Sequence, residues 1–69
     1  MKLEIEIEQE ADGRWLADVP ALPGVMAYGA DRAEAIVKVK VLALRTIADE
    51  IEHGERPAET ADAIFASAA

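Results

Sequence analysis

The chain has 69 residues, of which 52% are hydrophobic and 30% are charged, and it contains no cysteine. This length allows one small domain, and the lack of cysteine excludes disulfides, thiolate metal sites and a cysteine nucleophile. Fourteen acidic against seven basic residues give a net charge of −7, which opposes direct nucleic-acid binding and favours a basic partner. No apolar run approaches the roughly 18 residues of a membrane span, so we expect a cytoplasmic protein without membrane contact.

The first part of the chain predicts three antiparallel strands. Residues 1–8 alternate between apolar and charged side chains, as in a strand with one buried face. An Asp-Gly pair then favours a hairpin, and residues 14–19 alternate again. A proline-rich connection with the sequence PALPG follows, in which we expect Leu22 to point inward, and residues 25–28 suit a third short strand.

A long helix is predicted from Asp31, which can cap it, with Glu34 closing a capping box and Gly54 ending it. Its apolar arc is about 200° wide, roughly twice what packing on one three-stranded sheet requires. Lys40 falls inside this arc, where it would lie at an edge or pair with a carboxylate from elsewhere. We therefore expect a homo-oligomer, most simply a dimer. The helix residues predicted to form its interface are Val37, Val41, Leu44 and Ile51.

The segment after Pro57 is open to two interpretations. Residues 63–67 suit a fourth strand beside the first, whereas the many alanines also suit a helix. We favour the strand. The chain then predicts an α+β fold, a single β-β-β-α-β domain over residues 1–69, in which one long helix packs on the sheet.

No catalytic, cofactor-binding or metal site is predicted from the residue types. His53 is the single histidine, and it lies in the last helical turn, where the helix dipole favours a cation. Glu4, Glu6 and Glu8 line one face of the first strand, which suits a solvated face or a docking surface for a basic partner. A metal site or an acid–base pair is the remaining alternative for them. The residues favour binding over catalysis, so we expect no enzyme activity.

The run from Asp12 to Gly24, DGRWLADVPALPG, resembles the HicB antitoxin family. That family has an acidic residue and glycine in a hairpin, a strand with a central alanine, then valine-proline and leucine-proline-glycine. The likeness continues through Gly29, Asp31 and the glutamate-alanine pair that opens the helix, and it covers roughly residues 2–57.

The resemblance implies a partial ribonuclease-H-like domain that silences HicA, a small basic toxin that cleaves messenger RNA. Such an antitoxin acts by occluding the toxin, and the acidic charge of this chain suits that role. Family members commonly add a DNA-binding domain, and we expect this chain to be a short form that lacks it. The residues expected to meet the toxin, on the sheet face or the connecting loop, are Glu4, Glu6, Trp15, Asp18 and Leu22.

Two other functions remain open. The first is a stand-alone homo-oligomer that has no toxin partner and binds an unknown ligand. The second is a residual hydrolase or metal-dependent nuclease that uses Glu4, Glu6 and Glu8. A small basic reading frame beside this one is expected for the antitoxin and not for the stand-alone protein.

Overall fold

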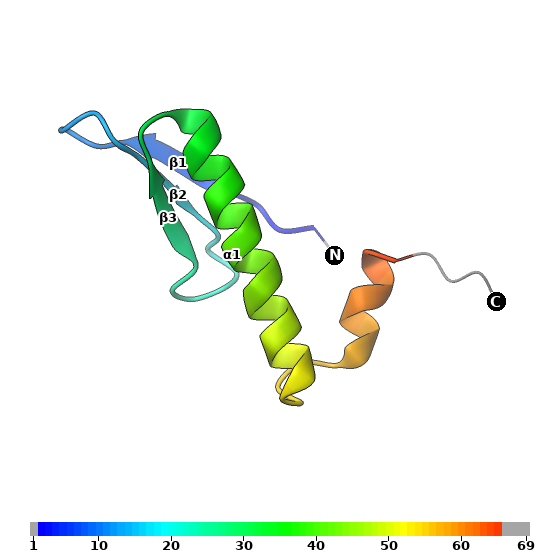
Figure 1. The fold of residues 1–69 in the computed structure, drawn as a ribbon. Coiled ribbons are helices and arrows are strands. Elements are labelled where there is room, and N and C mark those ends of the chain that lie inside the picture. Colours follow the sequence, from blue (N-terminus) through cyan, green and yellow to red (C-terminus); the bar gives the residue numbers. More distant parts are fainter. Residues whose placement is uncertain (1, 66–69) are drawn as a thin grey trace.

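The computed structural model describes residues 2–65 and contains one antiparallel sheet with one long helix packed on it (Figure 1). The strands lie in the order β1-β2-β3, so each is paired with its neighbour in sequence. The predicted α+β fold with three antiparallel strands is therefore confirmed. The elements are β1 (Glu6–Gln9), β2 (Trp15–Asp18), β3 (Met26–Gly29), α1 (Arg32–Glu52) and a short 3-10 helix, η1 (Ala58–Ala63).

The hairpin between β1 and β2 is closed by the Asp-Gly pair, as the sequence predicts. Gly13 adopts a φ of +93°, a conformation that side chains other than glycine rarely tolerate. One carboxylate oxygen of Asp12 accepts a hydrogen bond from the backbone N–H of Arg14 at 3.0 Å, and the other lies 2.7 Å from the Arg14 guanidinium Nε. These contacts hold the pKa of Asp12 below its ordinary value of 3.8. The turn thereby fixes the register in which Glu6 lies opposite Asp18.

The connection from β2 to β3 is closed by its own backbone hydrogen bonds. The N–H of Val19 donates to the carbonyl of Val25 at 3.0 Å, and the N–H of Val25 donates to the carbonyl of Leu22 at 3.0 Å. Leu22 is only 3% exposed and belongs to the core, which confirms its inward placement. The bond from Val19 to Val25 continues the β2–β3 pairing. The next β2 residue that would face the first strand is Pro20, which has no N–H, so the β1–β2 ladder ends at Asp18 and β1 is shorter than predicted.

The N-terminus of α1 is capped by two side chains. The carboxylate of Asp31 accepts a hydrogen bond from the N–H of Glu34 at 2.8 Å. The carboxylate of Glu34 accepts one from the N–H of Ala30 at 2.8 Å and lies 3.4 Å from the Lys38 ammonium. The predicted pair of capping residues is present, although Glu34 reaches the residue before Asp31 and not Asp31 itself.

This capping arrangement makes helix stability depend on pH. The N–H of Ala30, followed by the charge of Lys38, holds the pKa of Glu34 below its ordinary value of 4.5. A carboxylate whose pKa is lower when folded stabilises the protein above pH 4.5, and this contribution is lost as the pH falls through the folded pKa. We expect wild type to melt above Glu34→Gln at neutral pH, with the two melting temperatures converging below pH 4.5. Glu59→Gln is the control. A difference in melting temperature between wild type and Glu34→Gln that does not change with pH, or that equals the difference for Glu59→Gln, would contradict this expectation.

The C-terminus of α1 is fixed by a tight turn and an ion pair. Gly54 adopts a φ of +74°, and the N–H of Glu55 donates to the carbonyl of Glu50 at 2.8 Å, which is a Schellman arrangement. The guanidinium of Arg56 contacts the Glu50 carboxylate at 3.1 Å, with both side chains 26% exposed. The turn is therefore held to the last helical residues by both backbone and side-chain contacts.

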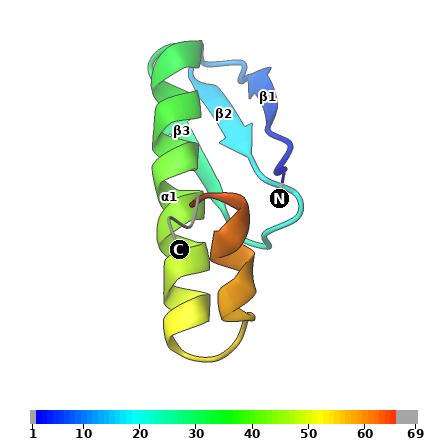
Figure 2. The same cartoon turned by 90° about the vertical axis from the view of Figure 1, so that its right-hand side faces the viewer.

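The core lies between α1 and the sheet, but α1 does not cover the sheet evenly. The helix lies mainly over β3 and β2 and leaves β1 to one side (Figure 2). Gly29 of β3 allows the closest approach, because a Cβ there would lie 2.4 Å from the backbone nitrogen of Ala35. Ile7 of β1, and Leu3 and Ile5 before it, pack against the core but are only half-buried. The buried core residues are Ala17, Val19, Leu22, Val25, Ala35, Val39, Ala43 and Ile47.

The predicted fourth strand over residues 63–67 is wrong for the residues that the structure describes. Residues 58–63 form η1, and residues 64 and 65 belong to no strand. The backbone of this alanine-rich segment forms hydrogen bonds within the segment: the N–H of Thr60, for example, donates to the carbonyl of Pro57 at 3.0 Å. Residues 66 and 67 lie outside the described residues.

Candidate partner-binding surface

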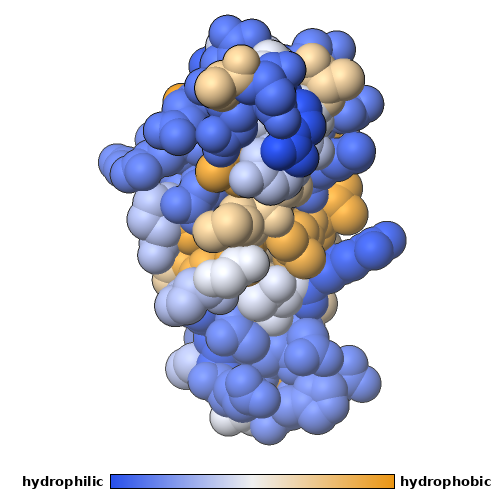
Figure 3. Space-filling model, turned by 90° about the vertical axis from the view of Figure 1, so that its left-hand side faces the viewer, coloured by the Kyte–Doolittle hydropathy of each residue, from blue (hydrophilic) through white to orange (hydrophobic). Residues whose placement is uncertain are grey.

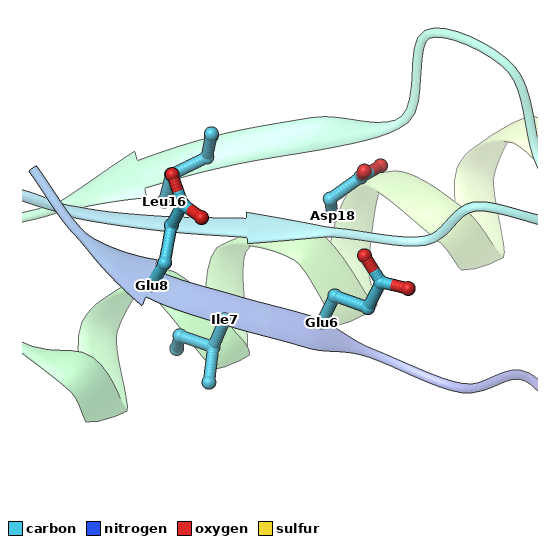
Figure 4. A pocket seen from close by; sticks show the side chains of 5 residues that line it. All are labelled: Glu6, Ile7, Glu8, Leu16 and Asp18. Carbon is cyan, nitrogen blue, oxygen red and sulfur yellow. The ribbon is translucent and has the colours of Figure 1, made fainter.

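The sheet presents one face to α1 and the opposite face to solvent. Side chains alternate along each strand, so every second residue points away from α1. Figure 4 shows this for β1, where Ile7 projects toward α1 while Glu6 and Glu8 project to the other side. We call the solvent side the outer sheet face, and it consists of Glu6, Glu8, Leu16, Asp18, Met26 and Tyr28.

The half of this face formed by β1 and β2 is acidic. Glu6 lies directly opposite Asp18, and their carboxylates project to the same side of the sheet (Figure 4). Like charges in opposed positions of an antiparallel pair destabilise it. Neither carboxylate forms an ion pair with any residue between 2 and 65. Together with Glu8 and Leu16 they line a shallow hollow of about 330 Å³. The carboxylates give this hollow a net negative charge.

The half formed by β2 and β3 is apolar. Leu16 lies opposite Tyr28, and Asp18 lies opposite Met26. Met26 and Tyr28 are 48% and 42% exposed, and Figure 3 shows hydrophobic residues gathered at the middle of the sheet side of the molecule. The guanidinium carbon of Arg14 lies 4.3 Å from the centre of the Tyr28 ring, a cation–π contact at the hairpin end. The outer sheet face thus suits a partner that offers both basic and apolar side chains.

The five residues predicted to meet a partner do not share one surface. Glu4, which precedes β1, lines a hollow of about 360 Å³ together with Glu6 and the start of the connecting loop. Glu4 and Glu6 therefore lie together, and Asp18 lies opposite Glu6. Trp15 is half-buried and packs against the core, and Leu22 is within the core. Neither side chain belongs to the outer sheet face.

Sequence reasoning missed the apolar half of the outer sheet face. Met26 and Tyr28 alternate with Val25 and Ala27, so their shared direction could be read from the third predicted strand. Their position beside Leu16 depends on the register between β2 and β3, which is set by the connection that precedes β3.

A second apolar surface lies on the side of α1 that faces away from the sheet. Val37, Val41 and Leu44 are 61%, 43% and 56% exposed, and we call these three residues the α1 back. Ile51, the fourth residue predicted for an oligomer interface, packs partly against the core. The structure therefore leaves three of the four interface residues uncovered.

Within residues 2–65, no group of three or more histidine, cysteine, aspartate or glutamate side chains is arranged to hold a metal ion. His53 interacts within its own helix, since its ring Nδ1 lies 2.8 Å from the carbonyl oxygen of Asp49. Over the same residues, no helix is long and apolar enough to cross a membrane.

Comparison with known proteins gives one informative relative. No family model matches the chain, and no solved structure matches it. The chain is 32% identical over 65 residues to the UPF0150 protein Ta0767 of Thermoplasma acidophilum, and the aligned region covers 93% of this chain and 94% of that protein. This identity extends over nearly the whole length of both proteins, so the chain belongs to the UPF0150 family.

Proposed function

We propose that the chain is an antitoxin-like binding module that neutralises a small basic toxin of the HicA type by covering it. The observation that carries the proposal is the opposed pair of Glu6 and Asp18, which lacks a cation among residues 2–65 and lies beside exposed apolar side chains. A basic partner would relieve the repulsion between the two carboxylates. The resemblance of the hairpin and the PALPG connection to HicB antitoxins supports the same partner class, and the UPF0150 relative is compatible with it.

Occlusion explains how such a module acts without chemistry of its own. A ribonuclease must hold the phosphate backbone of its substrate with basic side chains. An acidic surface competes for those side chains, and complementary charge also raises the rate of association. In this proposal the chain is neither an enzyme nor a cofactor-binding protein, and it acts in the cytoplasm, where messenger RNA is translated.

The proposal is tested with tagged protein recovered from its native lysate at low and moderate salt. Mass spectrometry and sizing of the complex should show a small basic protein in stoichiometric amount, held less strongly as salt increases. The captured protein, once separated, should cleave RNA, and adding the chain back should suppress cleavage. Capture of no basic protein, or cleavage that continues at saturating chain, would refute the proposal.

The exposed α1 back favours a second candidate, a stand-alone homo-oligomer that works without a toxin. Val37, Val41 and Leu44 are neighbours on one helix face, and a contiguous exposed apolar patch is typical of an interaction site. This candidate predicts self-association at both salt concentrations and no captured basic protein.

Self-association through the α1 back is tested by replacing Leu44 with aspartate. Leu44 is 56% exposed in the single chain, so we expect the fold to survive and the dissociation constant of the oligomer to rise about 100-fold, because a charge would be buried without a partner. Light scattering coupled to size exclusion measures this. Leu42→Asp is the matched control, because Leu42 is 37% exposed and lies on a different side of α1. An equal effect of both substitutions would show that the α1 back does not form the interface.

A further inference from the structure

A groove opens on the inner side of the sheet, between α1 and the residues that lead into β1. Its volume is about 290 Å³, and its lining is almost entirely apolar. Leu44 belongs both to this groove and to the α1 back, so the two apolar surfaces are continuous. We call it the β1–α1 groove, and its lining residues are Leu3, Ile5, Val19, Lys40, Ala43 and Leu44.

The tail of the same chain carries apolar side chains that have no place in the core. Ile64 and Phe65 are 51% and 71% exposed, and η1 contains no buried residue. The N–H of Phe65 donates to the carbonyl of Ala61 at 3.0 Å, so the helical turn continues through Phe65. Asp62 precedes Phe65 by three residues, which places the two on neighbouring positions of one side of that turn. The tail thus presents an aromatic ring next to a carboxylate.

The β1–α1 groove has an apolar lining and a lysine, which match the aromatic ring and the carboxylate of the tail. Lys40 and Leu44 are four residues apart on α1 and therefore lie on one side of the helix. Neither Lys40 nor Asp62 forms an ion pair with any residue in the described range 2–65. An apolar pocket with a lysine at its rim suits an aromatic side chain that is accompanied by a carboxylate.

Among the residues that the structure describes, Ile64 and Phe65 do not line the groove of their own chain. The turn before η1 is held by the contact of Arg56 with Glu50 at 3.1 Å and by the backbone bonds around Gly54. After this turn η1 runs back alongside the C-terminal half of α1, on the side where the N-terminal segment emerges (Figures 1 and 2). Phe65 accordingly remains 71% exposed.

We propose that the β1–α1 groove of one chain receives Ile64 and Phe65 of a second copy, while Asp62 of the tail pairs with Lys40. The exchange is reciprocal, so it closes a two-fold dimer in which each chain gives its tail and receives the other. The dimer also brings the α1 back of each chain next to the partner, because Leu44 lines both surfaces. The proposal is independent of the antitoxin function, which uses the opposite face of the sheet.

The exchange is tested with engineered cysteines, since the chain has none of its own. Leu44→Cys and Phe65→Cys are prepared separately with tags of different mass, mixed and oxidised gently. We expect a covalent dimer that contains one copy of each variant, seen by denaturing electrophoresis without reductant and identified by mass. A mixture of Leu42→Cys with Phe65→Cys is the control and should give at least about 10-fold less mixed product, because Leu42 is exposed outside the groove.

A chain that carries both Leu44→Cys and Phe65→Cys separates the two possible directions of the tail. Exchange between chains should give covalent dimers from this double variant. A monomer with an internal disulfide would show that the tail folds onto its own groove and would overturn the proposal. Mixed product no greater than in the control would overturn it as well.

Discussion

Replacing Gly29 with alanine is expected to lower the free energy of unfolding by about 3 kcal/mol, at the upper end of the cost of overpacking a core. The added Cβ would lie 2.4 Å from the nitrogen and 2.9 Å from the Cα of Ala35. Both neighbours are backbone atoms in the first turn of α1, so relief requires moving the helix away from β3. Because the core lies between these two elements, such a movement would loosen the packing of Val39 as well.

Gly54→Ala is the matched control for this substitution. Gly54 adopts a φ of +74° but has open space around it, so alanine there should cost only the conformational term, about 1 kcal/mol. Urea unfolding of both variants measures the two costs side by side. If Gly29→Ala is no more destabilising than Gly54→Ala, the close packing of β3 against α1 is not as described.

Reversing the charge of the opposed carboxylates is expected to abolish tight binding of a basic partner. The double variant Glu6→Lys, Asp18→Lys should weaken the complex about 100-fold, since like charges brought together across an interface cost several kcal/mol. The two side chains remain like-charged and opposed on the sheet, so we expect the stability of the free chain to change little. Titration calorimetry with the basic protein captured by wild type measures the affinity.

A second double variant, Glu55→Lys with Glu59→Lys, changes the net charge equally and leaves the outer sheet face intact. Both residues are exposed and lie beyond the end of α1. This variant should lose only the small, salt-sensitive part of the affinity that depends on net charge. Equal losses in both double variants would mean that the partner responds to overall charge and not to the outer sheet face.

The parts of the fold that were predicted correctly depend on neighbours in the sequence. Asp31 caps α1 through a residue three positions away, and Gly54 ends it through a turn that any helix can use. The strand predicted over 63–67 is wrong where the structure describes it, because the strand interpretation gave too little weight to the helix propensity of the alanines. Whether such a segment becomes a strand depends on whether a sheet edge pairs with it, and here residues 58–63 form η1 instead.

The candidate surface was predicted in part for a similar reason. Alternation in the first two strands places Glu6 and Asp18 on the solvent side, and the structure confirms that placement. The same alternation groups Trp15 with Ala17 on the side that faces α1, which is where the structure has it. The apolar half required the register between β2 and β3, because only the register brings Tyr28 beside Leu16. The register between two strands cannot be predicted from the residues within each strand alone.

The central claim is that the outer sheet face holds the basic partner, and a nuclear magnetic resonance titration tests it most directly. Isotopically labelled chain is titrated with the small basic protein recovered from the lysate, and the backbone amide signals are followed. We expect the largest changes along β1, β2 and β3, centred on Glu6, Leu16 and Asp18, with the signals of the α1 back unchanged. Changes confined to Val37 and Val41, with none on the outer sheet face, would contradict the account.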